Sequence, residues 1–169
     1  MSQLTDVYLN TLRGIAHRSN QVVVLSIISI FGCLLLVYQF AENVSVPLLN
    51  ITTTSGRATI ALLAIYFLLG FVGANLRSFW HSNLNMLQIE DFSLASAVKC
   101  FPCIFNSSIW LRIPIILTSL SALGWTFQSG SKPLGWGAGI FCALFFVSPH
   151  IRMFIPSYKQ DRKHKKDLT

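Results

Sequence analysis

The chain has 169 residues, of which 53% are hydrophobic and only 11% are charged, and its formal net charge is +7. Soluble domains carry about 25% charged residues, so this chain has too few charges to cover a soluble globular surface. The composition therefore excludes an ordinary soluble fold and predicts a protein that lies mostly within lipid.

Four segments are apolar enough to cross a bilayer as helices: residues 22–41, 58–76, 109–127 and 134–151. About 20 helical residues cross a hydrocarbon core of about 30 Å. The third segment reaches this length only if it begins near Ile109, with the Arg112 side chain extending toward the interface. In the fourth segment Pro149 lies in the last turn, where its missing N–H is expected to kink the helix. We expect the first segment to be a retained signal-anchor.

The basic residues are sorted to one side of these segments. If each segment crosses once, only two of the 13 Lys and Arg, Arg57 and Lys132, lie on the side opposite the termini. Lys and Arg in short loops stay in the cytoplasm. We therefore expect an integral membrane protein with both termini cytoplasmic, in a bacterial inner membrane or an ER-type membrane.

Several basic residues are predicted to hold this topology by contacting anionic lipid headgroups. Arg77 and Arg152 follow the second and fourth segments. Residues 157–169 form a basic cytoplasmic tail, whose charges are Lys159, Arg162, Lys163, Lys165 and Lys166. Because this charge is confined to a short tail next to a span, we expect it to bind lipid and no nucleic acid.

Two further stretches, residues 1–18 and 84–105, have apolar residues at helical spacing. They are predicted to be amphipathic helices in the cytoplasmic interface; the alternative is that they fold back onto the bundle. Asp91 or Ser93 is placed to cap a new helix. The predicted fold class is thus an all-α integral membrane protein, a single membrane domain of four transmembrane helices in two hairpins with amphipathic interfacial helices.

The second and fourth segments resemble each other. Aligning Arg77 with Arg152 also aligns Phe79 with Phe154 and Ser82 with Ser157. The two hairpins are then a parallel repeat about an axis along the membrane normal. The alternative is chance, because apolar segments draw on few residue types.

Small residues recur on the faces of the segments, and small side chains let helix backbones approach closely within lipid. The candidate packing residues are Gly70, Gly73, Gly135, Gly139, Cys142 and Ala143. The pattern predicts helix contacts but leaves open whether the partner helix belongs to this chain, to a second copy or to another membrane protein.

Little in the sequence indicates chemistry. Cys100 and Cys103 have the spacing of a redox pair, but the predicted topology places them on the reducing side of the membrane. The expected topology puts His17, His81 and His150 near that same interface, where packing and headgroup contact are the simplest roles. No catalytic motif, metal site or cofactor-binding motif is found. No acidic or basic residue lies in the core of the spans, which argues against an ion-coupled transporter.

These observations favour a non-enzymatic membrane protein that acts through helix contacts, as an accessory, assembly or exclusion-type subunit of a larger membrane complex. The basic tail and the face from Gly135 to Ala143 are the residues expected to serve it. One alternative is a small oligomeric pore or small-molecule transporter. A second alternative is a membrane thiol-redox protein that uses Cys100 and Cys103.

Overall fold

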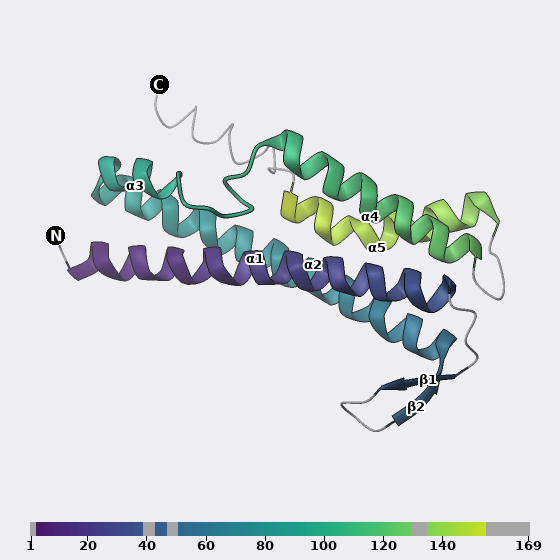
Figure 1. Ribbon diagram of the computed structural model, residues 1–169. Helices are drawn as coiled ribbons and strands as arrows, with labels where there is room; N and C mark the ends of the chain where they lie inside the picture. Colours follow the sequence, from purple (N-terminus) through teal and green to yellow (C-terminus); the bar gives the residue numbers. More distant parts are fainter. Residues whose placement is uncertain (1–2, 39–42, 47–50, 130–134, 155–169) are drawn as a thin grey trace.

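The computed structural model describes residues 3–38, 43–46, 51–129 and 135–154 (Figure 1). These residues form five helices and two short strands: α1 (Gln3–Tyr38), β1 (Asn43–Val46), β2 (Ile51–Thr54), α2 (Ser55–Glu90), α3 (Phe92–Val98), α4 (Ile109–Ser129) and α5 (Trp136–Phe154). Four of the helices, α1, α2, α4 and α5, are long and apolar enough to cross a membrane. This confirms the predicted all-helical, four-span class, and α4 begins at Ile109 as expected.

The first two long helices differ from the last two in length. α1 and α2 have 36 residues each, whereas α4 has 21 and α5 has 19. α1 and α2 therefore run past the end of the second hairpin, with α3 folded back beside them (Figure 1). We call this part of α1, α2 and α3 the extension, and the part in which all four long helices lie together the bundle.

The predicted amphipathic stretches belong to the extension. Residues 3–18 are the first turns of α1, continuous with the apolar segment that follows, and residues 84–90 are the last turns of α2. Asp91 ends α2 and caps α3, with its Oδ1 accepting the Leu94 N–H at 3.0 Å. The apolar faces of these stretches pack against each other within the protein, and their position relative to a membrane remains a prediction.

Two hydrophobic cores lie one after the other along the long helices. The bundle core contains residues from all four long helices, among them Ile30, Leu63, Leu123 and Val147. The extension core joins α1, α2 and α3 to the loop before α4 and the end of α5, and its most buried members are Leu12, Trp80, Leu87, Ala95, Val98 and Met153. The extension thus has an apolar core of its own beside that of the bundle, and Ile116 packs against both cores.

The connection between α1 and α2 contains an antiparallel hairpin of β1 and β2, in which Asn43 pairs with Thr54 and Val46 with Ile51. No strand was expected from the sequence in this connection. The signal was present in the β-branched residues of both strands. The hairpin lies at the opposite end of the molecule from the extension (Figure 1).

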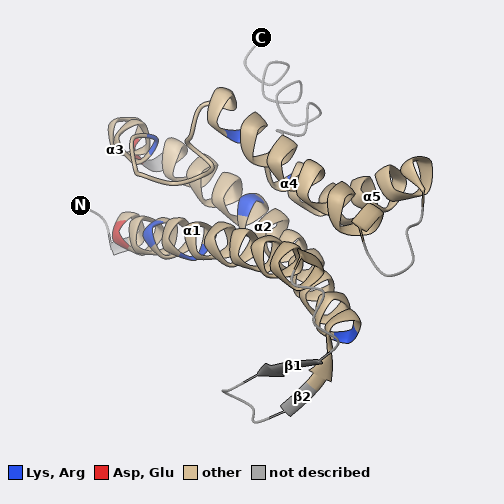
Figure 2. Cartoon of the chain, turned by 45° about the vertical axis from the view of Figure 1, so that its right-hand side comes forward, with Lys and Arg blue, Asp and Glu red and all other residues tan. Residues whose placement is uncertain are grey.

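Among the described basic residues, most lie toward the end that carries the N-terminus, and Arg57 at the start of α2 lies near the β-hairpin (Figure 2). We call the end of the bundle next to the extension the arginine end, because Arg77 and Arg112 lie there. Lys132 and the tail of residues 157–169 lie outside the described residues.

Candidate functional site: two buried polar groups in the helix bundle

Arg77 and Arg112 together hold the last residues of α5. Arg77 of α2 donates from Nη1 to the carbonyl of Met153, and Arg112 of α4 donates from Nη1 to the carbonyl of Phe154 at 2.9 Å. The final carbonyls of a helix have no partner within the helix and carry partial negative charge. The two guanidinium groups therefore cap the C-terminal end of α5 from two other helices.

Arg112 also fixes the loop that precedes its own helix. Its Nη2 donates to the carbonyls of Phe105 (2.7 Å) and Ser107, and its Nε donates to the Ser107 hydroxyl at 3.2 Å. The planar guanidinium has five N–H donors in a fixed fork, which suits it to hold several acceptors at once. One side chain thus ties α4, its preceding loop and α5 together.

These contacts show partners that the sequence did not indicate. The side chains of Arg77 and Arg112 are only 7% and 8% exposed. Each binds backbone carbonyls inside the protein, and their position relative to the interface and the headgroups stays a prediction. Arg152, by contrast, is exposed, and its headgroup contact remains a prediction.

The loop between α3 and α4 is fastened to α1 by side-chain hydrogen bonds. The Asn20 amide donates to the carbonyl of Pro102 at 3.0 Å and accepts the N–H of Ile104 at 3.2 Å. Asn106 donates to the carbonyls of Val98 and Phe101 from within the loop. A short segment without regular structure is in this way given a fixed shape against the extension core.

The two thiols of the redox-spaced pair lie in different surroundings. Cys100 is exposed, whereas Cys103 is buried, with its Sγ 3.3 Å from the Ser19 hydroxyl and 3.5 Å from the N–H of Phe105. Both are free cysteines. The environment of Cys103 is that of a packed structural residue, and the described residues contain no group of three or more His, Cys, Asp or Glu able to hold a metal ion.

A second polar group lies deeper in the bundle. The His150 ring of α5 stacks on the Tyr66 ring of α2, with centroids 4.0 Å apart and an interplanar angle of 8°. The His150 Nε2 is 3.1 Å from the Ser26 hydroxyl of α1. Tyr66 lies near the middle of the predicted second span, whereas His150 lies near the end of the predicted fourth span, so the depth of this cluster in a membrane stays a prediction. His150 is only 4% exposed, and the expectation that it contacts headgroups is wrong.

This cluster has hydrogen-bonding capacity that the protein does not use. Among the described residues, neither the Tyr66 hydroxyl nor the His150 Nδ1 has a hydrogen-bond partner. The Tyr66 hydroxyl lies near Ser119 of α4, but the Ser119 hydroxyl donates to the carbonyl of Ile115 at 2.8 Å and no hydrogen bond of ordinary geometry joins the two side chains. A buried polar atom without a hydrogen-bond partner lowers the stability of the fold. The two atoms therefore mark this position in the bundle as a candidate functional site.

Glycines make the close approach of α2 and α5 possible. A Cβ on Gly70 would lie 2.6 Å from the His150 Nδ1, and a Cβ on Gly73 would lie 2.4 Å from the Met153 Sδ. The two helices therefore meet where α2 has no side chains, and this contact brings the His150 ring onto Tyr66.

The other predicted packing residues divide between the inside and the surface. Gly139 and Ala143 are buried, and a Cβ on Gly139 would lie 3.7 Å from the Phe127 Cβ of α4. Cys142 is half-buried, and Gly135 is exposed with a positive φ of 76° just before α5. Gly139 and Ala143 thus serve contacts within this chain, whereas the exposed face of α5 carries Gly135 together with large side chains such as Trp136, Phe141 and Phe145.

The sequence analysis missed the Ser26, Tyr66 and His150 cluster, although all three residues were visible in the spans. His150 lies one residue before the end of the predicted segment and was therefore expected at the interface, whereas α5 continues to Phe154 and the contact with α2 buries the ring. Comparison with models of protein families, with curated proteins and with solved structures gives no match for this chain.

Proposed function

We propose that the protein is a non-enzymatic subunit of a larger membrane complex, and that it contacts its partner through the end of the extension. The observation that carries this proposal is a set of exposed large apolar side chains, which we call the tip patch. Its members are Leu4 and Val7 of α1, Met86 and Ile89 of α2, and Phe92 of α3. Their side chains are 50% to 81% exposed.

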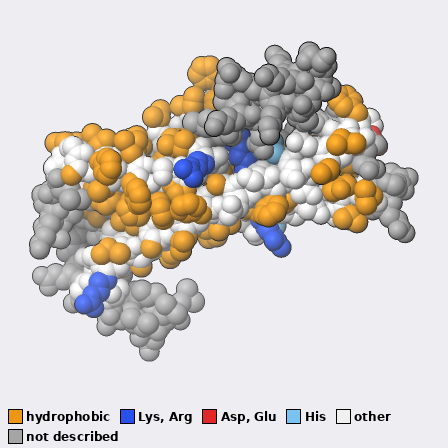
Figure 3. All heavy atoms as spheres, turned by 180° about the vertical axis from the view of Figure 1, so that it is seen from behind, with side chains coloured by type: hydrophobic (Ala, Val, Ile, Leu, Met, Phe, Trp, Pro, Cys, Tyr) orange, Lys and Arg blue, Asp and Glu red, His pale blue; other side chains and the backbone are white. Residues whose placement is uncertain are grey.

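The tip patch is separate from the apolar surface of the bundle. On the face seen in Figure 3, hydrophobic side chains cover the bundle and gather again at the far end of the extension, with fewer between them. Apolar side chains on the bundle face lipid in a membrane protein and need no other explanation. A cluster of exposed apolar side chains outside lipid is uncommon and is typical of a protein contact.

The length of α2 places the tip patch beyond the headgroups. Ile89 follows Arg77 by three turns of α2, which corresponds to about 18 Å along the helix axis. The headgroup region on each side of the hydrocarbon core is only about 5 to 8 Å thick. If Arg77 marks the edge of the hydrocarbon, the tip patch extends past the membrane surface. In that position we propose that a partner protein covers it.

The small-residue faces on which the sequence argument relied support this proposal less than the tip patch does, because Gly70, Gly73 and Ala143 are already packed within the chain. The contact is therefore assigned to the extension and not to the face from Gly135 to Ala143.

Photo-crosslinking tests the proposal directly. A photoreactive residue placed at Ile89 should give a discrete protein adduct in intact membranes, whereas the same residue at Ile60, which is 68% exposed on the bundle, should give lipid adducts. An adduct at Ile89 with the mass of two copies identifies a homo-oligomer. Lipid adducts alone at Ile89 would show that the extension lies on the membrane surface, and the proposal would be abandoned.

Substitution provides the second arm of the test. Met86→Ser, Ile89→Ser and Phe92→Ser combined should release the partner in mild detergent while the chain still inserts and folds. The matched control is Met86→Leu, Ile89→Val and Phe92→Leu, which keeps an apolar surface and should retain the partner. Equal retention by both triple variants would contradict the assignment to the tip patch.

A further inference from the structure

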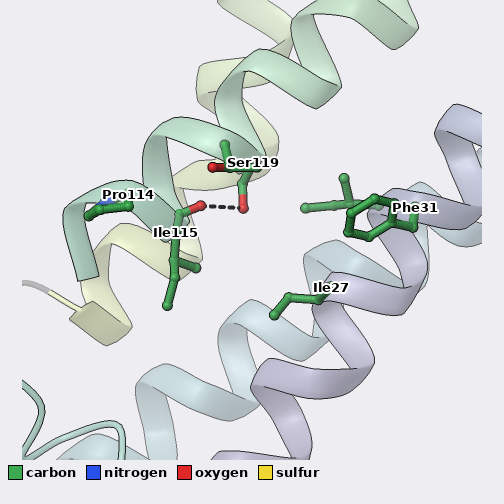
Figure 4. A pocket seen from close by; sticks show the side chains of 7 residues that line it. Ile27, Phe31, Pro114, Ile115 and Ser119 are labelled. Atoms are coloured by element: carbon green, nitrogen blue, oxygen red, sulfur yellow. Dashed lines mark hydrogen bonds between the residues drawn. The ribbon is translucent and has the colours of Figure 1, made fainter. Parts of the chain in front are cut away.

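A groove runs along the seam between α1 and α4. Ile27 and Phe31 of α1 face Pro114, Ile115 and Ser119 of α4 across it (Figure 4). Its volume is about 230 Å³, which exceeds the 150 Å³ or so of an apolar cavity that binds benzene. The only hydrogen bond drawn within it joins the Ser119 hydroxyl to the carbonyl of Ile115, so the lining offers an apolar surface.

A separate and more polar hollow lies at the arginine end. It has a volume of about 560 Å³ and is lined by the loop before α4, including Lys99 and Ser107, together with Asn20 of α1 and Leu111 of α4. Asn20 and Ile27 lie seven residues apart, and Leu111 and Ile115 lie four apart, so each pair shares one helix face. The hollow and the groove therefore follow the same two faces, one beyond the other.

The combined length matches one leaflet of a bilayer. From Asn20 to Phe31 the helix rises about 16 Å, and half of the hydrocarbon core is about 15 Å. The polar end lies level with the buried arginines, and the apolar end lies near the middle of the bundle. A molecule that fills both parts must itself have a polar end and a hydrocarbon chain.

The charge of the polar end selects the headgroup. Lys99 lines the hollow, and a second hollow on the other side of Phe101 and Pro102 carries Arg13 and His17. The Arg13 guanidinium lies 5.8 Å from the centroid of the Phe101 ring, which fixes it beside this loop. No Asp or Glu is among the described residues that line either hollow, so the local field is positive and favours an anion.

We propose that this site binds one anionic glycerophospholipid, with an acyl chain in the groove between α1 and α4 and its phosphate beside Lys99. Arg13 contributes positive potential from the far side of Phe101 and makes a smaller contribution than Lys99. The Asn20 amide, which donates to the Pro102 carbonyl and accepts the Ile104 N–H, holds the wall of the site. The site belongs to a single chain, so its occupation does not depend on the partner proposed for the tip patch.

The test uses the full chain purified in a maltoside detergent and titrated with dioleoyl phosphatidylglycerol, with retained lipid counted by native mass spectrometry. We expect one tightly retained lipid per chain and weaker retention of dioleoyl phosphatidylcholine. Lys99→Gln should weaken binding about fivefold, the effect of one basic charge near the surface, and Arg13→Gln should weaken it less. Arg57→Gln is the matched control, because it removes the same charge from the exposed opposite end and should change nothing.

The groove is tested separately from the charge. Ile27→Trp should fill the groove and abolish retention of the single lipid. If this variant fails to fold, Thr118→Phe fills the groove from α4, where Thr118 also lines it. Inorganic phosphate in excess should not displace the lipid, because it lacks the chain. Equal retention of the two lipids would overturn the proposal, and so would retention that neither groove-filling variant changes. If Lys99→Gln weakens retention while both groove-filling variants leave it unchanged, the lipid is held by general attraction between charges and the proposal is likewise overturned.

Discussion

The arginine pair and the histidine cluster are both polar groups buried among the same four helices, yet they differ in how completely their atoms are used. Arg112 alone makes hydrogen bonds to Phe105, Ser107 and Phe154. In the cluster, the Tyr66 hydroxyl and the His150 Nδ1 have no hydrogen-bond partner in the part of the chain that the structure describes. A buried polar group whose atoms all form hydrogen bonds stabilises one arrangement of its helices, whereas a buried polar atom without a partner lowers the stability of the fold.

The difference shows that the two groups have different effects on the fold. The two arginines bind the C-terminal end of α5 to α2 and α4. The side chains of Met153 and Phe154, at that same end of α5, belong to the extension core. The His150 ring is brought onto Tyr66 by the close approach at Gly70 and not by a hydrogen-bond network of its own. The comparison between the arginine pair and the histidine cluster can therefore be tested by separate substitutions. One removes the arginine charge, one changes the close approach of α2 and α5, and one removes the polar atoms of the His150 ring.

The largest effect is expected for Arg112→Ala. The change leaves the carbonyls of Phe105, Ser107 and Phe154 without their donor, and each hydrogen bond to a charged group contributes about 1.5 to 3 kcal/mol. We expect the free energy of unfolding in detergent to fall by about 3 kcal/mol or more. Thermal or denaturant unfolding followed by circular dichroism measures this loss.

Arg152→Ala is the matched control for this prediction, because Arg152 is an exposed arginine near the same end of α5. It should change stability by no more than about 0.5 kcal/mol. Arg112→Lys should be intermediate, since a single ammonium cannot reach both the loop and α5 as the guanidinium fork does. Equal losses for the two alanine variants would show that charge at this end, and not the hydrogen bonds, matters.

The spans were predictable because hydropathy and length alone identify an apolar helix. The capping role of Arg112 was not, because its partners lie in the loop before α4 and at the end of α5, and only the tertiary structure brings them together. From the sequence alone, Arg112 was expected at the membrane interface, because arginines near the start of a membrane helix usually lie there. The same limit applies to Arg77, which binds a residue in a different hairpin.

The repeat suggested by the sequence does not describe the contact between α2 and α5. Equivalent residues of a parallel two-fold repeat lie at the same level, which would place Gly73 beside Ser148. The structure places Gly73 beside Met153, more than one helical turn away. The aligned arginines also differ, because Arg77 is buried on Met153 whereas Arg152 is exposed.

A smaller loss is expected for Gly70→Ala. The added Cβ would lie 2.6 Å from the His150 Nδ1 and 2.8 Å from the Pro149 Cβ, so α5 must shift. Overpacking of this kind costs about 1 to 3 kcal/mol. Gly124→Ala is the control, because nothing lies within 4 Å of a Cβ at that position and the change should be neutral or stabilise the helix. Unfolding midpoints of the two variants provide the measurement, and equal midpoints would contradict the close approach at Gly70.

His150→Phe should have a smaller effect than either change. Phenylalanine keeps an aromatic ring against Tyr66, loses the contact with Ser26 and removes the unpaired Nδ1. The lost hydrogen bond is worth about 1 kcal/mol, and removal of a buried polar atom without a partner offsets it. We therefore expect a change within about 1 kcal/mol of zero. A loss as large as that of Arg112→Ala would show that the Nδ1 has an essential partner and that the cluster resembles the arginine pair after all.

The smallest effect is expected for Asp91→Ala, which removes a helix cap from the surface. The N–H of Leu94 and the hydroxyl of Ser93 donate to the Asp91 carboxylate and lower its pKa from the ordinary value. The cap therefore stabilises α3 at pH values above the ordinary pKa of Asp, and this contribution is lost as the pH falls through the lowered pKa.

Hydrogen exchange at the Leu94 N–H should accelerate in Asp91→Ala while the global unfolding midpoint stays the same. Asp91→Asn should retain the protection and lose its dependence on acid, because the amide accepts the same hydrogen bond without titrating. A fall in the global midpoint would instead place Asp91 with the buried arginines, as a group on which the whole fold depends.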